Sequence, residues 1–220
     1  MDIEVDGLEV IRSNQIILNN VYFKFEKSKT TGIFGRNGAG KSTFFDVIVG
    51  LVRPNNISMR VNGKYAKSII QNNLLSYLSQ GDCFPKYSKV SEISSIFDIL
   101  PTKLNEICNQ GKFKKDMKMA ELSTGQRRLF EVLIFINSKH DFTILDEPFT
   151  GLMPIQIENV IEEIKDLKYR KGFIISDHQL KNHLEILDTS FMIKDRSSYI
   201  LPMEDLKEQL EKYSYLPSGW

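Results

Sequence analysis

Residues 35–43 read GRNGAGKST, in which three glycines lead into a lysine and two hydroxyl side chains. This run satisfies the pattern Gly-x4-Gly-Lys-Ser/Thr of a phosphate-binding loop. Glycine permits backbone conformations in which successive N–H groups point at phosphate oxygens, and the loop runs into the positive end of a helix. Lys41 is placed to reach the β- and γ-phosphates of a nucleotide, and the Ser42 hydroxyl to ligate magnesium. The nucleotide-contacting residues predicted in this loop are Asn37, Gly38, Ala39, Gly40, Lys41, Ser42 and Thr43.

Two adjacent carboxylates follow later in the chain, where residues 143–154 read TILDEPFTGLMP. Asp146 ends an apolar run, and burying its charge is costly unless something pairs with it. In a fold built on a phosphate-binding loop, this strand runs beside the loop's own strand, so that Asp146 can hold magnesium through water. Glu147 then points toward the γ-phosphate and can polarise an attacking water. A surface turn with two solvated acids is the alternative, and the glycine-rich loop favours the magnesium site.

The phosphate-binding loop alone leaves kinases, GTPases and many ATPases open, and residues 122–126 narrow the choice. They read LSTGQ, directly before a predicted helix. This resembles the signature motif of ATP-binding cassette (ABC) ATPases, usually LSGGQ, with Thr124 in place of one glycine. Gln80, after a predicted strand, resembles the glutamine loop of that family, and His178 in IISDH resembles its switch histidine. The chain is therefore identified as a member of the ABC family, over about residues 3–200.

The resemblance implies how ATP is bound. In this family two domains face each other head to tail and hold two ATP molecules between them. Each ATP lies on one subunit's phosphate-binding loop and beneath the other's signature, where Ser123, Gly125 and the helix N-terminus can donate hydrogen bonds to the γ-phosphate. The implied signature contacts are Ser123, Thr124, Gly125 and Gln126, the catalytic residues are Glu147, His178 and Gln80, and the magnesium ligands are Ser42, Gln80 and Asp146.

The implied function is that of an ATP-binding and ATP-hydrolysing transporter subunit. It would power a separately encoded transmembrane permease, as a homodimer or a heterodimer, from the cytoplasmic face of the cell membrane. The stretch EPFTGL and the run GFIISDHQLKNHLEILD are similar to subunits that serve lipopolysaccharide export and branched-chain amino-acid uptake. Phe84, just past Gln80, is expected either to line a groove for the partner or to pack in the core of a helical subdomain.

Two positions depart from the family pattern. Residues 10–14 read VIRSN, where the family usually carries an aromatic ring that stacks on adenine, so Arg12 is the candidate for stacking on the base. Met153 stands where the family usually has an aspartate that couples the two subunits, and it cannot accept hydrogen bonds as a carboxylate does. Because Glu147 and His178 remain, hydrolysis is the expectation.

Two alternatives stay open. One is a nucleotide-gated regulatory or scaffold module with little turnover, which the two departures favour. The other is a family member that acts on ribosomes or DNA. Such proteins generally hold two cassettes in one chain or insert a long coiled coil, and 220 residues leave no room for either. The predicted partners therefore include no nucleic acid.

Apolar runs and amphipathic helices alternate along the chain, which predicts a parallel sheet covered on both faces. With the resemblance, the predicted fold class is α/β: a P-loop NTPase core with a mainly parallel sheet, an N-terminal antiparallel β subdomain and a short helical subdomain insert. The predicted single domain of residues 1–220 divides into a nucleotide-binding core (1–80 and 122–200), a helical subdomain (81–121) and a short C-terminal helix and tail (201–220).

The individual elements follow from periodicity and turn residues. Asn19-Asn20 is predicted to be a turn, and Asn62-Gly63 the turn of a hairpin. Leu180, Leu184 and Leu187 indicate a helix, as do Leu206 and Leu210. The predicted strands are residues 21–25, 32–34, 74–78, 142–145 and 173–176, and the predicted helices are residues 41–51, 90–100, 104–107, 124–137 and 154–167.

Composition excludes several other classes. Charged residues make up 26% of the chain and hydrophobic residues 41%, with a formal charge of +1, so there is no strongly basic footprint for nucleic acid. The longest uncharged apolar stretch, residues 132–137, is far shorter than the ~20 residues that span a bilayer. The acidic N-terminus lacks a signal-peptide pattern. Two cysteines without a CxxC motif favour neither a disulfide framework nor a zinc site. These features predict a cytoplasmic protein without a membrane span of its own.

Overall fold

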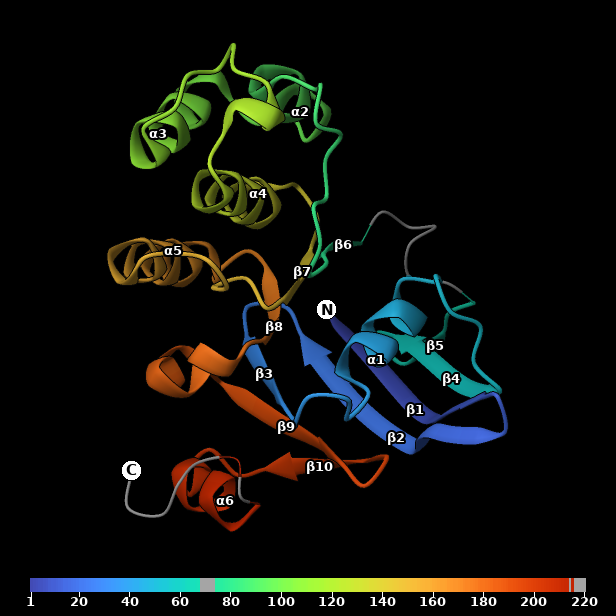
Figure 1. The fold of residues 1–220 in the computed structure, drawn as a ribbon. Helices are drawn as coiled ribbons and strands as arrows, with labels where there is room; N and C mark the ends of the chain where they lie inside the picture. Colours follow the sequence, from blue (N-terminus) through green and yellow to red (C-terminus); the bar gives the residue numbers. More distant parts are fainter. Residues whose placement is uncertain (68–73, 214, 216–220) are drawn as a thin grey trace.

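A computed structural model of the chain describes residues 1–67, 74–213 and 215 (Figure 1). Its N-terminal part is an antiparallel sheet with the strand order β2-β1-β4-β5. These strands are β1 (Asp2–Arg12), β2 (Gln15–Glu26), β4 (Asn56–Val61) and β5 (Lys64–Tyr65). The predicted hairpin is confirmed, because Val61 pairs with Lys64 across Asn62 and Gly63, both of which have positive φ. The predicted turn at Asn19-Asn20 is wrong, because β2 runs through both residues. The register of β2 against β1 shifts between Leu18 and Val21, and Asn20 has a positive φ of 51° at this shift.

The second sheet has six strands in the order β10-β9-β3-β8-β7-β6, and only the pair of β9 and β10 is antiparallel. Its strands are β3 (Thr30–Phe34), β6 (Leu75–Leu78), β7 (Phe142–Asp146), β8 (Gly172–Ser176), β9 (Thr189–Lys194) and β10 (Ser197–Leu201). Every residue of β3, β7 and β8 is buried, as expected for central parallel strands that are covered on both faces. The α/β fold class with one mainly parallel and one antiparallel sheet is confirmed.

Helices connect and cover these strands. Figure 1 shows α2 and α3 at one end of the molecule, beyond α4, while α1 lies next to the antiparallel sheet. The helices are α1 (Lys41–Ile48), α2 (Val90–Ile96), α3 (Pro101–Gly111), α4 (Thr124–Asn137), α5 (Pro154–Leu167) and α6 (Leu206–Lys212), with the 3-10 helices η2 (Met119–Glu121) and η3 (His178–Ile186). Among the residues that the structure describes, no helix is long and apolar enough to cross a bilayer.

Three predicted helices differ from the structure. The one predicted over residues 90–100 ends as α2 at Ile96, and Asp98 beyond it takes a φ of 55°. The one predicted over residues 41–51 ends at Ile48, because Gly50 takes a φ of 74° and reverses the chain after the last turn. Leu51 is consequently 73% exposed, although its spacing fits the buried face. The segment around Leu180 and Leu187 forms the 3-10 helix η3, which is interrupted at His183 (φ −136°, ψ 40°).

The remaining helix predictions agree in type with the structure. The C-terminal helix is present as α6, with Leu206 and Leu210 buried, and residues 214 and 216–220 of the predicted tail lie outside the described residues. Phe84 packs in the core of the helical end, with ring centroids 5.7 Å from Phe97, 6.1 Å from Phe130 and 6.0 Å from Phe135. These contacts favour the core interpretation of Phe84 over that of a groove residue.

Candidate functional site

The loop between β3 and α1 combines close packing with open backbone groups. Gly35 has a φ of 151°, and a Cβ atom there would lie 2.7 Å from the carbonyl oxygen of Ile193. Gly40, with a φ of 106°, is the N-cap of α1 and has no side chain with which to cap it. The first N–H groups of a helix have no intrahelical acceptor, so those of α1 are left for a ligand. This arrangement provides an anion-binding site at the start of the helix.

The loop opens into a cavity of about 520 Å³. The residues that line it come from β2, from the start of α1 and from the loops that follow β3, β6 and β7: Ile17, Asn37, Gly38, Gly40, Lys41, Ser42, Thr43, Gln80 and Glu147. Most of the residues predicted for the phosphates and for catalysis are therefore brought together, from positions up to 110 residues apart in the sequence (147 minus 37).

Lys41 lies folded over the loop, with only 7% of its surface exposed. Its Nζ donates hydrogen bonds to the carbonyl oxygen of Gly35 at 2.6 Å and to that of Arg36 at 3.2 Å. Burial lowers the pKa of Lys41, whereas the nearby carboxylates of Asp146 and Glu147 raise it. The ammonium group is therefore held within the loop next to the two carboxylates.

Asp146, at the end of β7, is fully buried, and its Oδ2 accepts a hydrogen bond of 2.8 Å from Ser42 Oγ. Its Oδ1 is also buried and has no hydrogen-bond partner among the described residues. Burial raises the pKa of Asp146, and Ser42, Lys41 and Gln80 oppose that shift. A buried carboxylate oxygen without a partner, beside a hydroxyl and a carboxamide, fits the oxygen ligands that magnesium prefers.

The described residues contain no group of three or more His, Cys, Asp or Glu side chains that could hold a metal ion. This is compatible with magnesium, which is usually bound through one or two protein oxygens and completes its coordination with substrate phosphates and water. The residues present therefore fit a magnesium–nucleotide complex better than an isolated metal site.

Glu147 and His178 approach each other at the edge of the cavity. His178 Nε2 lies 3.8 Å from Glu147 Oε1 and 2.7 Å from Asn37 Oδ1, so the histidine connects the carboxylate to the phosphate-binding loop. Glu147 has a φ of 51°, an uncommon conformation for a residue other than glycine. Such strain is kept where the surrounding structure enforces it. Here it turns the side chain of Glu147 into the cavity, where it could polarise a water molecule.

Arg128 is a site residue that the sequence analysis missed. This buried arginine of α4 donates hydrogen bonds of 2.9 Å to the carbonyl oxygens of both Asp146 and Glu147, and one of 3.0 Å to that of Ser79. It holds the strained backbone at Glu147 to the segment before Gln80. Arg128 could have been found in the sequence as a charged residue on the core-facing side of an apolar helix. A search for apolar periodicity does not detect it, because such a search considers only the apolar positions.

Asp177 is a second residue that was missed. It is 3% exposed, and its carboxylate accepts hydrogen bonds from the backbone N–H of Phe149 at 2.8 Å and of Gln179 at 2.7 Å. Burial raises its pKa, and these two hydrogen bonds lower it. Asp177 thereby connects the turn after Glu147 to the start of η3, where His178 lies.

The LSTGQ segment lies elsewhere, and none of its residues lines the cavity at the phosphate-binding loop. Ser123 is the N-cap of α4: its Oγ accepts a hydrogen bond of 3.2 Å from the N–H of Gln126, whose side chain accepts one of 3.0 Å from the N–H of Ser123. Thr124 is exposed, and a Cβ atom on Gly125 would lie 3.1 Å from the carbonyl oxygen of Gly151. The predicted nucleotide-binding residues of one chain therefore lie on two separate surfaces, the phosphate-binding cavity and the N-terminus of α4.

The two departures from the family pattern also have defined places. Arg12 is exposed at the end of β1 and does not line the cavity, whereas Ile17 of β2 does. Burial raises the pKa of Asp46 on α1, and the nearby charge of Arg12 opposes that rise. Met153 is 59% exposed and is the N-cap of α5. Its own side chain caps no backbone N–H, and its N–H donates a hydrogen bond of 2.9 Å to the Gln156 side chain.

Comparison with known proteins gives consistent matches. The profile of a family described as "ABC transporter" matches residues 18–150. The "Lipopolysaccharide export system ATP-binding protein LptB" of Acidithiobacillus ferridurans is 27% identical over 198 residues, which cover 82% of this chain and 81% of the relative. The "Manganese transport system ATP-binding protein MntA" of Synechocystis sp. is 26% identical, covering 94% of this chain and 89% of the relative.

Solved structures share the fold. A structure described as the "ATP binding subunit of ABC transporter" superposes with a TM-score of 0.81 at 19% identity, covering 99% of this chain and 95% of its own. The ADP conformation of MJ1267, described as an ATP-binding cassette of an ABC transporter, gives a TM-score of 0.79 at 21% identity, covering 98% of this chain and 97% of its own. At these identities the likeness supports the fold, which is that of a P-loop NTPase core.

Proposed function

The chain belongs to the ABC transporter family as an ATP-binding subunit, and from that premise we propose that it hydrolyses ATP and powers a separately encoded membrane permease. The observation that carries this proposal is the meeting of Glu147, His178 and Asn37 at the edge of the phosphate-binding cavity. The carboxylate of Glu147 and the ring of His178 lie together where the γ-phosphate of a bound nucleotide would be located. Such an arrangement serves the attack of water on a phosphoryl group.

In this mechanism each side chain has one task. The N–H groups of the loop and Lys41 hold the phosphates, and Lys41 exchanges its contacts with the carbonyl oxygens of Gly35 and Arg36 for phosphate oxygens. Glu147 orients a water molecule and takes its proton, while the ring N–H of His178 donates toward the γ-phosphate. Arg128 keeps the backbone of Glu147 in the conformation that aims its carboxylate.

Magnesium would be held by Ser42, Asp146 and Gln80, and it supplies positive charge that offsets the charge developing on the phosphates. The buried Oδ1 of Asp146, which lacks a hydrogen-bond partner among the described residues, supports this assignment. The Asp146 carboxylate also orients the hydroxyl of Ser42 through their hydrogen bond of 2.8 Å.

The working unit on this proposal is a dimer of ATPase subunits, formed by two copies of this chain or by this chain and a similar one. The two surfaces are separate within one chain, because residues 123–126 do not line the cavity. A γ-phosphate bound in the cavity can therefore meet such a segment only from a second subunit. The exposed N-terminus of α4 suits that contact, because it directs N–H groups and a positive dipole end outward.

The membrane partner would dock near the end of the molecule that α2 and α3 form, next to the segment that follows Gln80 (Figure 1). Tyr87 in that segment is 83% exposed, and Ile96 at the end of α2 is 78% exposed. The subunit would thus work in the cytoplasm, peripherally on the inner face of the cell membrane. The relatives' names include both lipopolysaccharide export and manganese transport, so they do not select a cargo for this chain.

Steady-state phosphate release from the purified protein with Mg-ATP tests the proposal, alone and with the candidate permease in membranes. The variant Glu147→Gln keeps the shape of the side chain and is expected to abolish release. The matched control Glu158→Gln changes an exposed carboxylate on α5 and should leave it unchanged. A wild-type protein that binds ATP but releases no more phosphate than Glu147→Gln, even with the permease, would contradict hydrolysis and support a nucleotide-gated regulatory module.

A further inference from the structure

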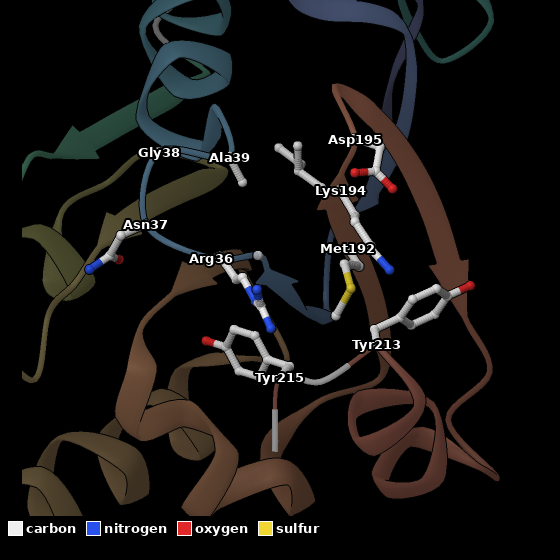
Figure 2. Close-up of a pocket in the computed structure, with 11 residues that line it drawn as sticks. Arg36, Asn37, Gly38, Ala39, Met192, Lys194, Asp195, Tyr213 and Tyr215 are labelled. Atoms are coloured by element: carbon white, nitrogen blue, oxygen red, sulfur yellow. The ribbon is translucent and has the colours of Figure 1, made fainter. Parts of the chain in front are cut away.

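Tyr215 follows the last helix of the chain, yet its ring lies at the switch histidine. The ring packs edge-on against Phe34 at a centroid distance of 5.4 Å, and it is nearly parallel to the ring of His178, at 12° and 6.3 Å. The Tyr215 hydroxyl lies 3.5 Å from His178 Nδ1. Figure 2 shows Tyr215 beside Arg36 of the phosphate-binding loop, at a cavity of about 470 Å³ that both residues line. Tyr215 therefore contacts the candidate catalytic site at His178.

The two nitrogens of His178 have different partners. Nε2 lies 2.7 Å from Asn37 Oδ1, which is a carbonyl oxygen and can only accept a hydrogen bond. In a neutral imidazole one nitrogen carries the proton and the other accepts. The contact with Asn37 therefore places the proton on Nε2 and leaves Nδ1 to accept a hydrogen bond from the Tyr215 hydroxyl.

Tyr215 is suited to remain a donor. Burial raises the pKa of Tyr215 to about 12, and the carboxylates of Asp177 and Glu147 act in the same direction. The hydroxyl is thus protonated throughout the physiological pH range. Because its ring packs against Phe34 and lies nearly parallel to the ring of His178, the hydroxyl oxygen has a defined position beside the histidine.

Charged groups surround the histidine from several elements. Glu147 approaches Nε2, Asp177 precedes His178 in the chain, and Arg36 and Lys181 line a cavity of about 240 Å³ together with Asn37, His178 and Tyr215. Both signs of charge are present, so the surrounding charges alone do not determine which nitrogen carries the proton. The direct hydrogen bonds at the two nitrogens make that selection.

We propose that Tyr215 is a positioning residue, whose hydroxyl donates to His178 Nδ1 and holds the tautomer that directs Nε2–H toward the phosphate-binding loop. This proposal rests on the proposed function, in which His178 donates to the γ-phosphate. It adds a residue from the C-terminal segment, which no motif of the sequence marks, to the residues that prepare the site for hydrolysis.

The experiment compares the wild type with Tyr215→Phe, which keeps the ring contact with Phe34 and removes only the hydroxyl. The matched control is Tyr213→Phe. The Tyr213 ring lies 5.8 Å from the ring of Tyr199 between centroids, and Lys194 Nζ lies 5.0 Å from the centroid of the Tyr213 ring, but Tyr213 is not a partner of His178. Protein with ¹⁵N-labelled histidine gives the ring-nitrogen signals of its three histidines, and His178→Gln assigns those of residue 178. Phosphate release gives kcat and KM for the same proteins.

In the wild type and in Tyr213→Phe, the signals of His178 are expected to show a protonated Nε2 and a hydrogen-bonded Nδ1. In Tyr215→Phe the Nδ1 signal should move to that of a free acceptor, with kcat about fivefold lower, as the loss of one hydrogen bond predicts, and KM unchanged. A wild-type His178 protonated on Nδ1, or ring signals that Tyr215→Phe leaves unchanged, overturns the proposal. The ring-nitrogen signals can be recorded without ATP turnover. They therefore test the tautomer of His178 even if the protein has no ATPase activity, separately from the proposed function.

Discussion

Replacing Lys171 with methionine is expected to change how the stability of this protein depends on pH. Lys171, just before β8, is 3% exposed, and its Nζ reaches four oxygens at the end of α4. These acceptors are the carbonyl oxygens of Phe135, Ile136 and Ser138 and the hydroxyl of Ser138, at distances from 2.8 to 3.3 Å. The lysine thus caps the C-terminal end of α4, the helix that contains Arg128 and begins within the LSTGQ segment.

The magnitude follows from the pKa. Burial lowers the pKa of Lys171 from its ordinary 10.5 to about 7. Between these two values the unfolded chain holds a proton on Lys171 that the folded chain has released, so the free energy of unfolding rises with pH in this window. The destabilisation is fully present below pH 7 and is removed as the pH approaches 10.5. At about 1.4 kcal/mol for each pH unit, the whole change is about 5 kcal/mol.

The assay is urea unfolding, followed by circular dichroism at several pH values between about 7 and 10. Groups that do not interact with Lys171 contribute equally to the wild type and to Lys171→Met. The pKa of His140, which burial and the charge of Lys171 lower from its ordinary 6.5, lies below this pH range, so the difference between the two proteins isolates Lys171. This difference should grow in favour of the wild type by several kcal/mol as the pH rises. The control Lys139→Met removes a side chain that is 74% exposed, and its profile should stay parallel to that of the wild type.

A parallel profile for Lys171→Met would refute the reasoning. It would mean that the four oxygens stabilise the ammonium group enough to offset its burial, so that Lys171 keeps its proton in the folded protein.

Three further predictions concern the site. Asp146→Asn should abolish the additional thermal stabilisation that Mg²⁺ gives to the ATP-bound protein, because a neutral amide replaces the buried carboxylate; an undiminished Mg²⁺ effect would contradict this. Arg128→Met leaves three carbonyl oxygens without their donor and should lower the free energy of unfolding by about 3 kcal/mol in urea, whereas Arg127→Met, which removes a partner of the exposed Asp82, serves as its control. Met153→Asp gives α5 an acidic N-cap and should raise the free energy of unfolding by about 1 kcal/mol, with a lower thermal midpoint as the opposing result.

Short segments of the sequence determined several features of this protein by themselves. The turn at Asn62-Gly63 and the buried strand that ends at Asp146 need only neighbouring residues to be recognised. The motif of residues 35–43 likewise places Lys41 and Ser42 at the start of a helix, because the glycines and the helix are contiguous in the chain. In these cases the physical cause, a backbone preference or an apolar periodicity, acts within about ten residues.

Other features were decided by tertiary structure alone. The position of Arg12 within the β1–β2 hairpin directed it to the side of Asp46, whereas Ile17 reached the cavity. No local pattern distinguishes these outcomes, since each depends on how a segment packs against a distant one.

The contacts that organise the candidate site are of this second kind. Arg128 meets the carbonyl oxygen of Glu147 across 19 residues, His178 meets Asn37 across 141, and Tyr215 meets His178 across 37. The sequence determined which chemical groups are available and where each lies on its own strand or loop. Which of them touch was decided by the order of strands in the mainly parallel sheet and by the packing of Tyr215 against Phe34. The reason is that side-chain contacts act over a few ångströms of space, whatever the distance along the chain.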